Sequence, residues 1–161
     1  MIDLATKNAK ASGLSNTSFI EASITSIPLP DSSVDCIISN CVINLVPAKD
    51  KGLVFHEIAR LLKPGGRLAI SDILARKELP KSIVDDMTLY VGCIAGASQV
   101  AEYEEYLRQA GFQGNVLFMF RWWLTKYWLV FRHFASRYKS EPESLQRVFL
   151  FTTKYIMLYP L

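Results

Sequence analysis

Two cysteines, Cys41 and Cys93, stand in contexts where a thiol could do chemistry. Cys41 follows the apolar run VDCIIS and Asn40, where a strand is expected to end. Cys93 lies in YVGCIAGA, between Gly92 and Gly96, which permit a close approach of the backbone to another group. Thiolates are the ligands that soft metal and metalloid centres prefer. Both positions therefore suit a soft ligand, although spacing alone favours simple packing for Cys93.

Helical and strand patterns alternate along the chain and predict an open α/β sheet with right-handed crossovers. Periodicity, caps and Gly or Pro stops indicate helices and strands in turn. Helices are expected at 2–12, from Pro47 to Lys63, at 81–91 and from Ser98, a plausible N-cap, to Ala110; strands are expected at 16–23, 34–42, 67–74 and 115–120.

In open α/β sheets, ligands bind beyond the carboxyl ends of the strands. This rule predicts that Cys36, in mid-strand, is buried and inert, whereas Cys41 lies at a strand end. Asp72 ends the next strand and either lines the same crevice or serves as a helix cap or turn residue. His56 and His133 have no cysteine or carboxylate at metal-ligand spacing, and no zinc signature occurs in the sequence.

Composition predicts one globular domain of cytoplasmic type. Half of the 161 residues are hydrophobic and 20% are charged, which argues against disorder. The N-terminus has no secretory pattern, and three cysteines in such a chain indicate reduced thiols. Residues 1–120 carry 11 Lys and Arg against 13 Asp and Glu, whereas residues 121–161 carry 7 against 2 and all three tryptophans. We therefore expect different structural or functional requirements to have shaped the two parts.

The segment HEIARLLKPGGRLAISD resembles class I S-adenosylmethionine-dependent methyltransferases. SNCVINLVPAKDK, together with LPKSIVDD and YVGCIAGA, resembles the arsenite methyltransferases, fungal ones in particular, and the resemblance covers residues 1 to about 118. It implies that Cys41 and Cys93 hold trivalent arsenic while the arsenic lone pair attacks the methyl group of S-adenosylmethionine. Because thiolates bind, it also implies a lowered thiol pKa or loss of a proton on binding. The expected substrate is an arsenite thiol adduct and not a nucleic acid.

The resemblance assigns fewer residues to the cofactor. It implies that Ile24 and Thr25 lie near the adenine, with Thr25 where the family often has an acidic residue, and that Asn40 lies near the methionine part. The family's glycine-rich turn and ribose-binding acid have no counterpart here, since no G-x-G occurs in the sequence, and an upstream cysteine is absent too. We therefore expect a truncated, impaired methyltransferase whose partial Rossmann-like sheet lacks its first two strands. The strand at 34–42 would then lack a neighbour.

The resemblance ends near residue 120, which divides a partial methyltransferase domain, 1–120, from an atypical tail, 121–161. RWWLTKYWLVFRHFASRYK is expected to be helical, aromatic and basic. It either covers exposed sheet or is a non-native coding tail; a helix on a membrane surface is less favoured because its amphipathicity is poor. Two alternative functions remain, a non-catalytic interaction protein and a lipid or quinone methyltransferase, and the paired cysteine contexts argue against the latter.

Overall fold

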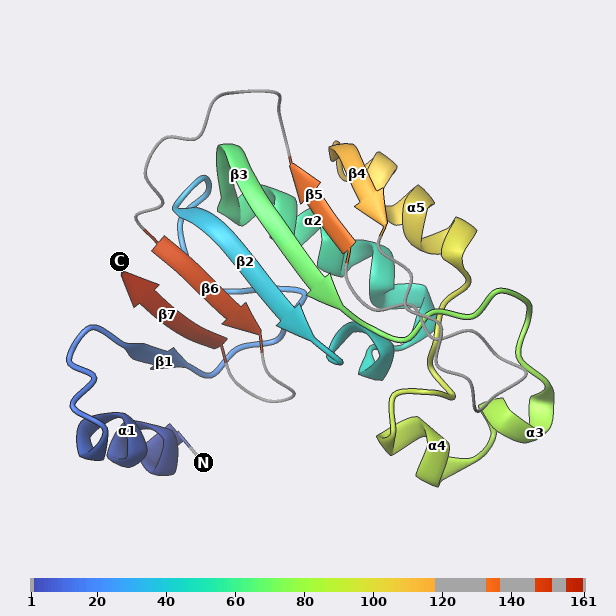
Figure 1. The fold of residues 1–161 in the computed structure, drawn as a ribbon, viewed down its shortest axis with the longest axis horizontal. Coiled ribbons are helices and arrows are strands. Elements are labelled where there is room, and N and C mark those ends of the chain that lie inside the picture. Colours follow the sequence, from blue (N-terminus) through green and yellow to red (C-terminus); the bar gives the residue numbers. More distant parts are fainter. Residues whose placement is uncertain (1, 118–132, 137–146, 152–155, 161) are drawn as a thin grey trace.

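The computed structural model describes residues 2–117, 133–136, 147–151 and 156–160, with side-chain surroundings up to residue 112. These residues form a seven-stranded sheet in the order β1-β7-β6-β2-β3-β5-β4 (Figure 1). The central strand β2 runs parallel to β3 and β6, and the other pairs are antiparallel. The strands are β1 Ser18–Ile20, β2 Val34–Asn40, β3 Leu62–Ser71, β4 Gln113–Leu117, β5 His133–Ser136, β6 Arg147–Phe151 and β7 Ile156–Pro160.

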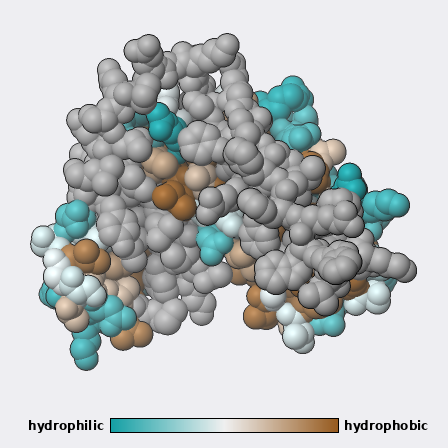
Figure 2. Space-filling view, viewed as in Figure 1, coloured by the Kyte–Doolittle hydropathy of each residue, from teal (hydrophilic) through white to brown (hydrophobic). Residues whose placement is uncertain are grey.

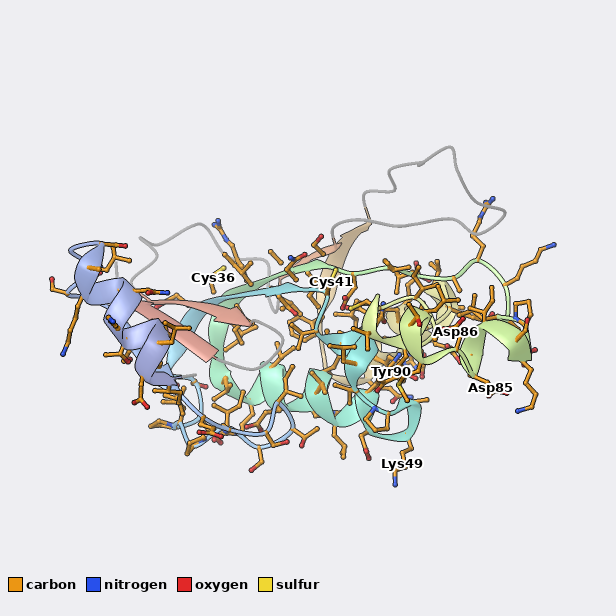
Figure 3. All side chains as sticks on the ribbon, turned by 90° about the horizontal axis from the view of Figure 1, so that it is seen from below. Cys36, Cys41, Lys49, Asp85, Asp86 and Tyr90 are labelled. Atoms are coloured by element: carbon orange, nitrogen blue, oxygen red, sulfur yellow. The ribbon has the colours of Figure 1, made fainter. Side chains whose placement is uncertain are left out.

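The core lies between the sheet and helices α2 and α5. Seen edge-on, α2 runs along one side of the sheet (Figure 3). Its Phe55 packs edge-to-face on Tyr103 of α5, with ring centroids 4.9 Å apart, and stacks on Tyr106 at 5.7 Å. The helices are α1 Ile2–Ala11, α2 Lys51–Leu61, α3 Lys81–Val84, α4 Met87–Val91 and α5 Val100–Gln109, with 3-10 turns η1 Ile43–Leu45 and η2 Ala48–Asp50.

The predicted alternation of helices and strands is confirmed up to β4, with two local corrections. Ser98 does not cap α5: Gln99 does, in a capping box with Glu102, while the Ser98 hydroxyl accepts a hydrogen bond from Lys51. The helix expected at 81–91 is two short helices. It is interrupted because the side chain of Asp86 accepts hydrogen bonds from two backbone N–H groups and starts α4 afresh.

Two predictions are wrong for the residues that the structure describes: that the tail is helical, and that the central strand lacks a neighbour. Within 121–161 these residues form β5, β6 and β7, and β6 lies parallel to β2 on the side opposite β3. RVFLF is rich in aromatic and branched side chains that favour strands, and the free edge of β2 offers unpaired backbone groups. The aromatic-basic stretch at 121–132 lies outside the described residues.

Helices α3 and α4 project from the sheet and bury no residue of their own. Val84, Met87 and Val91 are exposed there, and apolar side chains gather at this end of the molecule (Figure 2). Because apolar burial does not fix these helices, contacts at their ends must place the loop that follows α4. Of the helices described, none has the length and apolarity to cross a membrane.

One glycine in that loop fits because it has no side chain. A Cβ on Gly96 would overlap the backbone carbonyl oxygen of Asn44, whereas a Cβ on Gly52 in α2 would meet only the Tyr106 ring, at 3.8 Å. We expect Gly96→Ala to lower the free energy of unfolding by about 2 kcal/mol or more, because backbone must move. Gly52→Ala, the control, should raise it by about 0.5 kcal/mol. Urea denaturation measures both; an equal effect at the two positions would contradict the close packing of the loop.

Candidate functional site

The carboxyl ends of β2 and β3 meet at one edge of the sheet. Asn40 pairs with Ser71 in the parallel register, and the N–H of Cys41 donates to the Ser71 carbonyl at 2.8 Å. Cys41 and Asp72 therefore follow the two strands side by side. Figure 3 shows Cys41 at this end of β2 and Cys36 farther back along the strand.

Cys93, from the loop after α4, joins Cys41 at this edge. The Cys93 thiol donates to the Cys41 carbonyl oxygen at 3.0 Å, and the two thiols lie close enough for each to shift the pKa of the other. Cys93 is buried, whereas Cys41 is partly exposed. The structure thus brings together two thiols that lie 52 residues apart in the sequence.

Both cysteines have a left-handed backbone, with φ of +52° at Cys41 and +62° at Cys93. Among the described residues other than glycine, only Ser32 shares a positive φ. This conformation is strained for a residue with a side chain and persists only where its surroundings impose it. Two strained residues in contact with each other indicate that the site is held in place by its neighbours.

The thiols are protonated at neutral pH. Burial, then Cys41, then Asp72, raise the pKa of Cys93 to about 11. Burial and the Asp72 charge also raise the pKa of Cys41. The sequence left two alternatives, a lowered thiol pKa or proton loss on binding; among the described residues no cation outweighs burial, so the pKa values are raised and proton loss on binding remains.

Asp72 lies close to both thiols, as its effect on their pKa values indicates. Its side chain is 3% exposed, and burial raises its pKa to about 7. The backbone N–H of Ile43, the charge of Lys51 and the Tyr103 hydroxyl, which lies 3.5 Å from Oδ2, oppose this shift in pKa. Oδ1 has no hydrogen-bond partner among the described residues. The carboxyl can therefore exchange a proton near neutrality, next to the thiols.

The sequence did not predict the roles of two buried polar residues, Asn44 and Lys51. Asn44 is fully buried and donates to the carbonyl oxygens of Ile73, at 2.6 Å, and of Cys93, at 3.1 Å. Lys51 is 2% exposed and donates to the carbonyl of Gly96 and, at 2.9 Å, to the Ser98 hydroxyl. A polar residue inside the apolar run CVINLV was the available signal for Asn44; Lys51 resembles any charged residue at a helix start.

Of the remaining predicted residues, Asn40 directly precedes Cys41, whereas Cys36, Ile24 and Thr25 belong to other parts of the chain. Cys36 is buried on β2, as expected, and burial raises its pKa. Asn40 is exposed at the end of β2. Ile24 packs against the core, and the Thr25 hydroxyl lies 2.8 Å from that of Ser23.

The two histidines belong to other elements of the fold. His56 is exposed on α2, and His133 begins β5. No group of three or more His, Cys, Asp or Glu side chains in the described part of the chain is arranged to hold a metal ion.

The raised pKa of Asp72 predicts a pH-dependent stability. A carboxyl whose pKa rises on folding stabilises the fold at low pH and loses this contribution as pH rises from ~4 to ~7, by roughly 1.4 kcal/mol per pH unit. Asp72→Asn mimics the protonated form, so its unfolding free energy should exceed that of the wild type at pH 8 and approach it at pH 4. Urea denaturation across this range, with the exposed Glu104→Gln as control, tests this; a difference that does not change with pH would contradict it.

Relatives of known activity match the described part of the chain. The arsenite methyltransferase of Halobacterium salinarum is 40% identical over 113 residues, which are 70% of this chain and 28% of that protein. That of Aquipseudomonas alcaligenes is 43% identical over 108 residues, 65% of this chain and 31% of the relative. The expected resemblance to arsenite methyltransferases is thereby confirmed, and the chain spans less than a third of the length of these relatives.

Solved structures agree on the fold. An arsenic(III) S-adenosylmethionine methyltransferase from Chlamydomonas reinhardtii superimposes with a TM-score of 0.61 at 28% identity, covering 78% of this chain and 46% of that one. A SAM-dependent methyltransferase from Aquifex aeolicus, 22% identical, has a TM-score of 0.57 over 85% of this chain and 63% of that one, and supports the fold alone. Residues 1–111 match the family model described as a methyltransferase domain. The chain therefore belongs to the methyltransferase domain family and has a partial Rossmann-like α/β sheet.

Proposed function

We propose that this chain carries the arsenic-binding part of an S-adenosylmethionine-dependent arsenite methyltransferase site, with Cys41 and Cys93 as the arsenic ligands. The observation that supports it is the contact between the two thiols at the carboxyl end of β2. Trivalent arsenic is a soft centre that prefers thiolate ligands, and two neighbouring sulfurs chelate it. The similarity to arsenite methyltransferases points to the same substrate.

The raised thiol pKa values suit a substrate that carries hydroxide. When arsenious acid meets two thiols, two S–H and two As–O bonds break, two As–S and two O–H bonds form, and two waters leave. The thiol protons depart with the hydroxides, so protonated Cys41 and Cys93 react without a net release of protons. Asp72, with a pKa of about 7, can relay a proton through its carboxylate. The third arsenic position is left to a hydroxide or a small thiol.

The described residues fit the methionine end of S-adenosylmethionine better than its adenosine end. Asn40 is exposed next to Cys41, where an amide can bind the amino acid part. Thr25 offers no carboxylate for the adenine, its hydroxyl lies within hydrogen-bonding distance of Ser23, and the sequence has no G-x-G turn. When bound, the cofactor supplies the electrophilic methyl group, while this chain's thiols hold the acceptor. We therefore propose that the chain binds arsenic well and is impaired in methyl transfer.

The thiol pair predicts a selective loss of arsenical binding. Phenylarsine oxide binds two thiols and releases one water, so removing either sulfur of the pair removes the chelate. Cys41→Ser and Cys93→Ser should each weaken its binding by about a hundredfold or more, because the second As–S bond benefits from a high effective concentration.

Cys36→Ser is the matched control, since Cys36 lies back along β2 and should leave the affinity unchanged. Competition with a small dithiol measures all three dissociation constants. Equal losses at the three cysteines, or none at any, would overturn the proposed arsenic site.

The absent glycine turn predicts weak cofactor binding. In isothermal titration calorimetry with S-adenosylmethionine, we expect no saturation at about 1 mM cofactor. The dissociation constant would then lie in the range of unspecific contacts. The same sample should bind phenylarsine oxide, which serves as a control for folding. Saturable binding in the micromolar range would refute the proposed impairment.

A further inference from the structure

The loop that carries Cys93 has little apolar packing to hold it. It starts from α3 and α4, neither of which buries a residue, and Met87 and Val91 are each 72% exposed. Yet Cys93 itself is buried, with a strained left-handed backbone. Such a conformation persists only where other groups fix it. The loop is restrained by its buried Ala95, by the Tyr90 hydroxyl of α4, which donates to the Leu45 carbonyl at 2.6 Å, and by two further polar contacts from buried side chains.

The side chain of Asn44 supplies one such contact and lies at the centre of the site. Its amide nitrogen donates one hydrogen to the Cys93 carbonyl and the other to the carbonyl of Ile73, just after Asp72. Because both partners are carbonyl oxygens, the nitrogen must face them. Asn44 also lies three residues after Cys41, in the 3-10 turn η1 that follows β2. One buried amide thus links the Cys41 segment, the end of β3 and the Cys93 loop.

The ammonium group of Lys51 supplies the second contact, farther along the same loop. It donates to the carbonyl of Gly96 and to the hydroxyl of Ser98. Gly96 in turn approaches the backbone of Asn44 so closely that a side chain would not fit. Lys51 sits at the start of α2, whose core packing makes it a firm support. Asn44 therefore holds the loop at Cys93, and Lys51 holds it a few residues farther on, at Gly96 and Ser98.

We propose that Asn44 and Lys51 are positioning residues that hold the Cys93 thiol against Cys41, so that the pair binds arsenic as a preformed chelate. The inference rests on the proposed arsenic site and adds to it. Neither residue touches the arsenic atom. They raise the effective concentration of one thiol at the other, which sets the gain from the second As–S bond.

Asn44→Ala tests the first contact. Because a buried hydrogen bond is lost, we expect the affinity for phenylarsine oxide to fall by about tenfold. The thiols themselves remain, so Cys41 and Cys93 should both still be alkylated by iodoacetamide, Cys93 faster than in the wild type. Cys36 should stay protected, because the sheet is intact.

Lys51→Met tests the second contact with a side chain of similar length, and it keeps the inference testable if Asn44→Ala does not fold. We expect a similar fall in affinity with unchanged protection of Cys36. Ile58→Val, a core change in α2 that removes one buried methyl group, is the control for destabilisation and should leave the affinity unchanged.

The outcomes separate the two proposals. If the wild type does not bind phenylarsine oxide, the arsenic site itself fails. If the wild type binds and both Asn44→Ala and Lys51→Met bind equally well, the arsenic site stands and the positioning role is refuted. A loss in Ile58→Val as large as in the two variants would assign the effect to stability and also refute it.

Discussion

The register between β2 and β3 is the constraint on which the site depends. It pairs Asn40 with Ser71, and the hydrogen bond from Cys41 to Ser71 extends the pairing by one residue. Because side chains alternate along a strand, a slip of one residue would turn the end of β3 over and carry Asp72 away from the thiol. The apolar residues of β2 and β3 that face α2 fix this register, since a slip would also expose them. Core packing and site geometry thus require the same register between β2 and β3.

The site is costly for the fold in several ways. Two cysteines adopt a left-handed backbone, a lysine and a carboxyl group are buried, and polar atoms of Asn44 and Asp72 lack partners among the described residues. Each such feature disfavours folding by an amount that apolar packing must offset. Most of these features lie where β2 and β3 end, although Asp35 and Ser39 of β2 also have buried side-chain oxygens without partners among the described residues. Stability is given up where chemistry is expected, as is common for functional sites.

The sequence predicted the parts of this structure that depend on periodicity and chain order. Helical spacing located α2, and the rule that ligands bind at strand ends separated Cys41 from Cys36. It could not predict Asn44 and Lys51, because burial of a polar side chain depends on partners from a loop some fifty residues away. The helical prediction for the tail failed for a related reason: the residues RVFLF favour a strand, but the edge of β2 with which β6 pairs comes from a distant part of the chain.

The protonation of the thiols distinguishes the proposed chemistry from cysteine catalysis in general. A nucleophilic cysteine needs a thiolate, and proteins lower its pKa with a cation, a histidine or a helix N-terminus. Here burial and the Asp72 charge do the reverse, and they raise the pKa of both Cys41 and Cys93. A thiol so held is a poor nucleophile toward carbon, but it can condense with a centre that brings its own hydroxide as a proton acceptor. The raised pKa values of Cys41 and Cys93 thus agree with the proposed arsenic ligand, a soft centre that brings its own hydroxide.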